Sequence, residues 1–575
     1  MLEIESKNNN LFKEIKKLKE KKHRIKSNKY LIEGLRFVEE AIKSKVSIDS
    51  IIFTESFKEK NPDLFLKINE NIKLIQMNEA LLKQLCSTEN PQGIVGVINM
   101  QNKELKSGEL VVLVDKVQDP GNMGTIIRTA HAAGAAGIVM TKGTVDIYND
   151  KTLRSTMGSI FYIPIVEDDS LDFVKSLKKE GYKLVVSSLQ GKNNFFEENE
   201  TKFDDIFDKL VKLRDKMSKK LGFEDFVELG YVRMMRSDYR EYMIKNVRKQ
   251  VLKYVVPMAN ELYEKQAKRI GLEYLSYIDE GVEFLTGNAS LKGDSRYIIK
   301  NGKRMYSELS KETNEFFDFM LENELMDLET KKGKGAGGYC TYIPDYKSPF
   351  IFSNFNQTAD DIDVLTHEAG HAFQLYMSRW IDMPEINFPT LDSCEIHSMS
   401  MEFITWPWMD LFFKEDTDKY KFTHLSSSIK FIPYGVIVDE FQHYIYKNPN
   451  VDKSKRKEIW RFLEKKYLPH RKYGDNSFLE RGCWWFKQGH IFKNPFYYID
   501  YVLAQICALQ FWKKMIQDRD AGWKDYINIC KVGGTKSFLD IVSMGNLYSP
   551  FDDGCIESII GDVKSWFDEI NDSKL

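Results

Sequence analysis

The sequence predicts a multidomain protein in which an N-terminal α/β part is followed by a mainly α-helical part. Its 575 residues exceed what a single hydrophobic core usually holds. Short apolar runs alternate with helical periodicity up to about residue 192, which is typical of small α/β domains. The chain from residue 193 to 575 instead shows long segments with helical spacing and few breaks. The fold class therefore changes near residue 193.

A first α/β domain is expected over residues 1–105. Residues 1–30 are rich in lysine, which favours a basic helical segment that follows a phosphate backbone, with an ordinary solvated helix face as the alternative. The apolar patterns after it predict three strands and two helices. The strands are Ile48–Phe53, Ile72–Gln76 and Gly93–Asn99, and the helices are Leu31–Lys43 and Glu79–Leu85.

A second α/β unit is expected over residues 106–192. The buried-strand run Leu110–Val114 leads into a Gly-rich turn and a helix, a geometry that suits phosphate or nucleotide groups. Neither G-x-G-x-x-G nor a P-loop is present, so the signal from the residues alone is weak. A further strand is predicted at Phe161–Val166.

A helix with two histidines four residues apart dominates the C-terminal part. Thr358 is a suitable N-cap, and the acidic residues that follow suit the first turn of a helix. His367 and His371 then lie on one face, with Glu368 beside them, in the pattern H-E-x-x-H. A catalytic Zn²⁺ site needs three protein ligands and one open position, and Glu368 is placed to act as general base.

A third ligand is expected from a second helical stretch. Glu395 follows His371 by 24 residues, which allows a loop and a return helix. His397 lies at a similar separation along the sequence and is an alternative third ligand on that basis alone. The stretch resembles the thimet oligopeptidase/oligoendopeptidase F family, in which H-E-x-G-H is followed by E-x-x-S-x-x-x-E. The resemblance implies that Glu395 is the third zinc ligand, that His397 lies behind the ligands or lines the pocket, and that Ser398 and Glu402 orient the ligands.

The same resemblance implies a zincin-type domain over residues 193–575 that cleaves oligopeptides in an enclosed cleft. Gly337, Gly338 and Tyr339 lie in a Gly-rich loop, and Ser348–Asn356 reads as an edge strand that pairs with an extended substrate. The family places an oxyanion- and substrate-binding histidine and two tyrosines further on. His490, Tyr498 and Tyr501 match that spacing best, and Tyr497 is a further candidate.

The N-terminal 192 residues resemble a truncated SpoU-type (SPOUT) RNA 2′-O-methyltransferase. Its first motif, D-P-x-N-x-G-x-x-x-R-T-A, runs from Asp119 to Ala130, and Leu153–Ser159 is similar to the second. The resemblance implies RNA contacts at Asn122 and Arg128. The third motif, which builds the S-adenosylmethionine-binding knot, is absent from the sequence, so RNA binding is expected without methyl transfer. The chain looks like a fusion of two truncated genes, with an assembly artefact as the alternative.

Net charge, apolar runs and cysteine content limit the classes of protein to which this chain can belong. The net charge of −2 gives no overall argument for nucleic acid or membrane, and no apolar run of 18 residues occurs. The seven cysteines are odd in number and contain no C-x-x-C, as expected in a cytoplasmic protein. The sequence thus predicts a cytoplasmic zinc metalloendopeptidase acting on short peptides. The alternatives are an RNA methyltransferase and a non-catalytic RNA-binding module, and the oligomeric state stays open.

Overall fold

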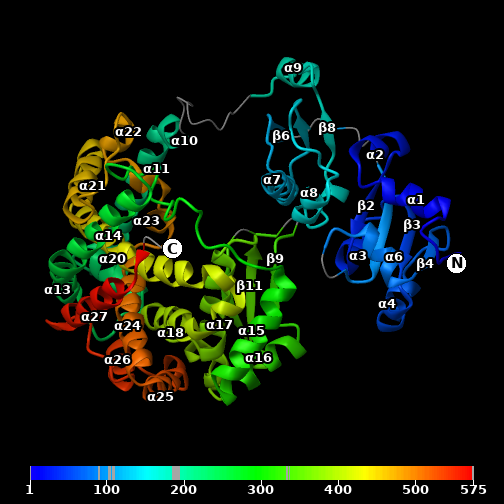
Figure 1. Cartoon of the computed structure of the whole chain (residues 1–575). Coiled ribbons are helices and arrows are strands. Elements are labelled where there is room, and N and C mark those ends of the chain that lie inside the picture. Colours follow the sequence, from blue (N-terminus) through cyan, green and yellow to red (C-terminus); the bar gives the residue numbers. More distant parts are fainter. Residues whose placement is uncertain are drawn as a thin grey trace. The chain divides into compact units, whose positions relative to one another are not determined.

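The computed structural model describes residues 2–88, 91–100, 105, 110–183, 195–331, 334–335, 337–572 and 575. These residues form two compact units. One holds Met1–Ser188 with Thr330–Gly335, and the other holds Leu189–Glu329 with Ala336–Leu575 (Figure 1). The expected boundary at residues 105/106 adjoins residues outside the described ranges, and that at 192/193 lies among them. The prediction of an α/β part followed by a mainly helical part is confirmed.

A five-stranded sheet with helices on both faces opens the first unit. Its order is β1-β4-β3-β5-β2, with β1 at Leu2–Ile4, β4 at Lys73–Met77, β3 at Ile48–Phe53, β5 at Ile94–Asn99 and β2 at Lys29–Glu33. One face packs on α1 and α6, the other on α3 to α5. The helices are α1 (Asn10–Lys17), α2 (Lys21–Ser27), α3 (Leu35–Lys43), α4 (Glu55–Lys60), α5 (Pro62–Leu66) and α6 (Glu79–Leu85).

The predicted helix Leu31–Lys43 is wrong in its first turn. Tyr30, Leu31 and Ile32 are all buried in β2, because a run of consecutive apolar residues fills both faces of a covered strand. Gly34, at φ 101°, then separates β2 from α3 in a conformation that other residues rarely adopt. The helix therefore begins at Leu35. Within the basic segment, α1 and α2 are confirmed as two short helices.

A three-stranded parallel sheet follows in the same unit. Its order is β6-β7-β8, with β6 at Val111–Val114, β7 at Gly137–Met140 and β8 at Ile165–Glu167. The helices α7 (Pro120–Ala132), α8 (Asp150–Ser155) and α9 (Asp172–Lys179) connect or follow these strands. The predicted strand Phe161–Val166 begins too early, because Ser159–Phe161 form a 3₁₀ turn.

The second unit is mainly helical. The helices that build the site are α17 (Asp360–Ser378), α18 (Leu391–Ile404), α20 (Thr417–Lys447), α23 (Gly489–Lys493) and α24 (Tyr498–Gln517). In the packing, α18 lies between α17 and α24, and α20 also packs on α24. The other helices used below are α11 (Glu200–Lys220), α12 (Phe226–Arg233), α21 (Lys453–Tyr467) and α27 (Cys555–Glu569).

A small sheet packs against α17. It has the order β10-β11-β9, with β9 at Met326–Glu329, β10 at Tyr339–Ile343 and β11 at Ser348–Phe355. The strand predicted at Ser348–Asn356 is present, but the expectation that it is an edge strand is wrong. Its backbone pairs with β10 on one side and β9 on the other. The sheet edge near α17 is instead β10, which includes Tyr339 of the predicted loop.

Candidate active site

The helix that carries the two histidines starts differently from the prediction. Its N-cap is Ala359, and Thr358 does not cap it, because the Thr358 hydroxyl donates to Oδ1 of Asn356 at 2.7 Å. Asp361 instead fixes the turn before the helix by accepting the backbone N–H groups of Asn356 and Gln357 at 2.9 and 2.7 Å. Three aspartates in the first turn suit the positive end of the helix dipole.

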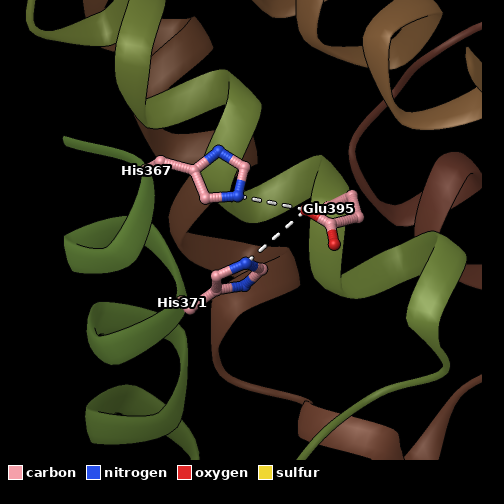
Figure 2. Close-up of side chains that lie close together, drawn as sticks. All are labelled: His367, His371 and Glu395. Carbon is pink, nitrogen blue, oxygen red and sulfur yellow. Dashed lines mark ion pairs between the residues drawn. The ribbon is translucent and has the colours of Figure 1, made fainter. Parts of the chain in front are cut away.

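The candidate metal ligands lie together (Figure 2). Oε2 of Glu395 is 3.3 Å from Nε2 of His367 and 3.5 Å from Nε2 of His371. One ligand atom from each of the three residues lies within 4.8 Å of the others. Two imidazoles from α17 and one carboxylate from α18 form a donor set that suits a tetrahedral divalent cation with one open position.

Gly370 allows α17 and α18 to approach closely enough for this arrangement. A Cβ atom at position 370 would lie 2.6 Å from Cα of Ser398 and 2.8 Å from the carbonyl oxygen of His397. Such distances are shorter than van der Waals contact, so any side chain at this position would separate the helices. The glycine between His367 and His371 therefore determines how near Glu395 comes to the imidazoles.

The ligands are oriented by a hydrogen-bonded layer behind them. Glu402 accepts from Nδ1 of His367 at 2.7 Å and pairs with Nε2 of His424 at 2.8 Å. Ser398 donates to Oε2 of Glu395 at 3.1 Å. On the far side, the indole N–H of Trp406 donates to Nδ1 of His424 at 3.2 Å. A carboxylate that holds the second nitrogen of a ligand histidine fixes the ring orientation.

His424 is a residue that the sequence analysis did not select. It lies 22 positions after Glu402 on α20 and shares no motif with it. Burial alone would lower the pKa of His424, but the hydrogen bond to Glu402 and the charge of Asp363 raise it overall. No spacing signal marks this residue, because the contact depends on how α20 packs.

His397 is neither a ligand nor part of a pocket wall in the described structure. Its side chain is fully buried, its Nδ1 bonds the carbonyl oxygen of Ser393 at 2.7 Å, and burial lowers its pKa to about 4. His397 and Glu395 are two positions apart on α18 and point in different directions. The group of possible ligand atoms contains Glu395 and not His397, which favours Glu395 as the third ligand.

Glu368 lies beside the ligands and is buried. Burial raises its pKa, the charges of His367 and His371 oppose the rise, and Oε2 has no hydrogen-bond partner among the described residues. A Cβ atom at Gly338 would lie 3.5 Å from Oε1 of Glu368. A buried carboxylate with a raised pKa and an unpaired oxygen is well suited to accept and release a proton.

The Gly-rich segment is only partly near this group. The carbonyl oxygen of Gly337 accepts from Asn354 at 2.8 Å, and the ring of Tyr339 is exposed and stacks on Phe352 at 4.9 Å. Residues 333 and 336 of the predicted loop lie outside the described residues. Of the three residues predicted to bind substrate, Gly338 is the one that lies next to Glu368.

The structure gathers the predicted histidine and tyrosines at the start of α24. The ring of His490 lies 5.0 Å from that of Tyr498 and 6.1 Å from that of Tyr501. Tyr497, the further candidate, donates from its hydroxyl to Oε1 of Glu395 at 2.7 Å. Burial raises the pKa of Tyr498 to about 12 and lowers that of His490. The tyrosines therefore stay protonated donors, and His490 stays neutral.

The two residues predicted to contact RNA are not on one surface. Both belong to α7, but Asn122 is exposed while Arg128 is buried. Residues six positions apart point to different sides of a helix, so one surface cannot present both. The backbone N–H of Asn122 is capped by Asp119 at 2.7 Å. RNA contacts at Asn122 and Arg128 therefore stay a prediction, and only Asn122 is exposed in this structure.

The structure also bears on the cysteines and on membrane-spanning helices. All seven cysteines are free, and all seven lie in the described part. Among the described residues, no helix is both long and apolar enough to span a membrane.

Models of protein families match both parts of the chain. The model described as peptidase family M3 matches residues 304–559. The model of an MRM3-like substrate binding domain matches residues 9–96, and that of the SpoU rRNA Methylase family matches residues 109–213. The last match reaches into α11, which belongs to the second unit.

Individual relatives agree with these matches. The 23S rRNA (guanosine(2553)-2′-O)-methyltransferase RlmP of Bacillus subtilis is 40% identical over 190 residues, which are 33% of this chain and 75% of the relative. The oligoendopeptidase F homolog of Borreliella burgdorferi is 27% identical over 302 residues, 50% of this chain and 49% of the relative. A solved structure of PZ peptidase A with an inhibitor is 57% identical, with a TM-score of 0.64, over 66% of this chain and 67% of that one. The chain thus spans about half to two thirds of the peptidases it matches.

Proposed function

Because the C-terminal part of this chain belongs to peptidase family M3 and its N-terminal part to the SpoU rRNA methylase family, we propose that it is a zinc-dependent metalloendopeptidase fused to an RNA-binding part. The membership itself makes the C-terminal part a metallopeptidase. The zinc ion, the endopeptidase reaction and the roles of single residues are the proposal. We also propose three domains, at residues 1–105, 106–192 and 193–575.

The cluster of His367, His371 and Glu395 is the observation that carries the peptidase proposal. Its donor set fits zinc, and the buried, unpaired oxygen of Glu368 lies beside it. We assign these three residues as the zinc ligands. Zinc, when bound, supplies Lewis-acid chemistry that makes water a stronger nucleophile at neutral pH and polarises a carbonyl group.

Residues of the chain carry out proton transfer and stabilise the oxyanion. Glu368 accepts the proton that the attacking water gives up and passes it to the leaving amine. His490, Tyr498 and Tyr501 donate hydrogen bonds to the substrate carbonyl oxygen as negative charge develops on it, and exclude water from it. Tyr497 holds Glu395 through its hydroxyl and so orients a ligand instead of contacting the substrate.

The expected substrate is a short peptide bound in an extended conformation. In the described structure β10 pairs with β11 alone, so its other edge offers backbone groups beside Gly338 and Glu368. An extended peptide that pairs with this edge would run past Glu368 as an added strand. This assignment replaces β11 by β10 as the strand that recognises substrate.

Cleavage of a quenched fluorescent oligopeptide by the purified full chain tests the proposal. We expect turnover that a chelator removes and added zinc restores. Glu368→Gln should lower kcat by about 10²- to 10⁴-fold, because a general base is lost while the ligands stay. Glu458→Gln, an exposed glutamate of α21, is the matched control and should keep full activity. Turnover that survives in Glu368→Gln would refute the role of Glu368.

For the first unit we propose RNA binding without methyl transfer. The matches to an RNA-substrate domain and to a methylase favour RNA, and the absence of the third motif from the sequence argues against cofactor binding. Calorimetry with S-adenosylmethionine should give no heat of binding, whereas a structured rRNA fragment should bind in a salt-dependent manner. Stoichiometric binding of S-adenosylmethionine would contradict the missing-knot argument.

A further inference from the structure

His490 can stabilise a developing oxyanion only through a nitrogen that carries hydrogen. A neutral imidazole has one N–H donor and one bare acceptor nitrogen, and the partner of one nitrogen decides which tautomer is present. Burial lowers the pKa of His490, which keeps the ring neutral, so its tautomer matters. The rings of Tyr497, Tyr498 and Tyr501 lie around that of His490, and the charge of Glu395 on α18 acts on it.

Nδ1 of His490 has a side-chain partner. Nε2 of Gln488 lies 2.8 Å from it, and the two residues are separated by Gly489 alone. An amide group can present either its N–H₂ or its oxygen to a histidine, so the contact by itself leaves the tautomer undecided. The other end of the amide settles it.

The amide oxygen of Gln488 is bonded to a phenol. The hydroxyl of Tyr434, on α20, donates to Oε1 of Gln488 at 2.8 Å. An amide oxygen can only accept, so the proton of the Tyr434 hydroxyl points toward Gln488.

The chain of hydrogen bonds therefore has one direction. Tyr434 donates to the amide oxygen of Gln488, and the amide N–H of Gln488 donates to Nδ1 of His490. With Nδ1 acting as an acceptor, the hydrogen of the neutral ring is on Nε2. Reversing the amide would leave the Tyr434 proton facing an N–H₂ group, which cannot accept it.

We propose that Gln488, held by Tyr434, is a positioning residue that fixes His490 in its Nε2–H tautomer and so makes it a hydrogen-bond donor to the substrate. The inference rests on the proposed peptidase function of this site. It adds Tyr434 and Gln488 to the site, and both act through His490 without touching the substrate.

Gln488→Glu is the sharpest variant, because a carboxylate at this position can only accept. It would draw the hydrogen of His490 to Nδ1, and neutral His490 would then present a bare Nε2. We expect kcat at pH 8 to fall by about 10²-fold, in line with the loss of one oxyanion donor, while zinc affinity stays unchanged. As pH falls, His490 becomes doubly protonated and regains a donor, so the ratio to wild type should rise.

Gln488→Met and Gln510→Glu are the controls. Gln488→Met removes the hydrogen bond without reversing it, so its kcat should fall less than that of Gln488→Glu and without the acid recovery. Gln510→Glu adds a buried carboxylate to α24 at a residue that bonds the backbone of Tyr548, away from His490. It should keep the wild-type pH profile. A Gln488→Glu profile parallel to wild type at every pH would overturn the proposal.

Nitrogen-15 NMR of histidine-labelled wild-type protein reads the tautomer without any need for activity. The long-range correlations of the ring nitrogens separate the two tautomers, and the His490→Gln variant assigns the signal. We expect the Nε2–H pattern at pH 7.5. An Nδ1–H pattern would refute the tautomer assignment whether or not peptides are cleaved, whereas an Nε2–H pattern in a protein without turnover would refute the peptidase proposal alone.

Discussion

Arg236 donates a hydrogen bond from Nη2 to the backbone carbonyl of Phe496 at 2.6 Å, and Phe496 has a left-handed backbone with φ 68°. The same guanidinium pairs with Asp500 at 2.5 Å, and the backbone N–H of Phe496 donates to Gln442 at 3.0 Å. A bulky residue in this conformation is strained, so its surroundings must hold it there. The turn leads directly into Tyr497 and Tyr498, so Arg236 positions the tyrosines of the site.

Removing Arg236 should therefore impair catalysis as well as stability. Arg236→Met leaves the buried carboxyl of Asp500, whose pKa burial already raises to about 8, without its cation, and should cost about 3 to 5 kcal/mol of stability. The double variant Arg236→Met with Asp500→Asn replaces that carboxyl by a neutral amide. It should regain stability and still show a reduced kcat, because the Phe496 carbonyl is released. Urea unfolding and peptide cleavage measure the two effects. Activity that returns together with stability would mean that Arg236 is only structural.

Gly230 should be intolerant of any side chain. A Cβ atom there would lie 2.5 Å from Cδ2 of Phe496, and the strained turn leaves the ring little room to move. Gly230→Ala should cost about 1 to 3 kcal/mol by overpacking, despite the better helix propensity of alanine. Gly561→Ala, in the middle of α27 with no heavy atom within 4 Å, is the control and should stabilise the protein slightly.

Loss of a zinc ligand should reduce zinc affinity more than loss of a residue that orients a ligand. His371→Ala should abolish stoichiometric binding, and Glu402→Gln should weaken it by about 10- to 100-fold, because the orientation of His367 is lost while all ligands remain. His23→Ala, in the first unit, is the control. Competition with a chromophoric chelator gives the dissociation constants. Equal affinities for Glu402→Gln and wild type would contradict the role of the hydrogen bond to His367.

The stability of the second unit should fall as the pH is lowered below 6.5. Burial holds the pKa of His397 near 4 in the folded protein against 6.5 when unfolded, so between these values only the unfolded chain takes up the proton. At pH 5 this favours unfolding by about 2 kcal/mol, and the effect is absent above pH 7. Tryptophan fluorescence during urea unfolding reports on this unit, because all nine tryptophans lie between positions 380 and 566.

The variant His397→Gln isolates this contribution. It should lose less stability than wild type between pH 7.5 and pH 5, by about 2 kcal/mol, whatever its stability at pH 7.5. A pH dependence identical to wild type would show that His397 is protonated in the folded protein.

The sequence correctly predicted features that depend only on neighbouring residues along the chain. The spacing of His367 and His371 on one helix and the strand Ile48–Phe53 are both found as expected. The errors arise where tertiary pairing decides. Whether a strand is central or at an edge depends on β9 and β10, and whether Leu31 is helical depends on the sheet that covers it.

The site residues that the sequence analysis did not identify contact partners far away in the sequence. His424 reaches Glu402 from another helix, and Arg236 reaches Phe496 across 260 positions. Neither has a motif, because each contact requires only that a polar group of suitable length arrive from a neighbouring element. Gln488 lies two positions from His490, but its effect depends on Tyr434, which the sequence places 54 residues earlier.

The division of the chain into separate apolar cores determines how it loses structure. One core runs from Phe207 to Phe567 within the second unit, and two others lie within the first, between Ile4 and Ile163. The core of the second unit shares no residue with the two cores of the first, so we expect heat to melt one unit while the other persists, and the chain as a whole not to unfold in one two-state transition. A calorimetric scan should resolve more than one transition, and a single melting temperature would describe neither part.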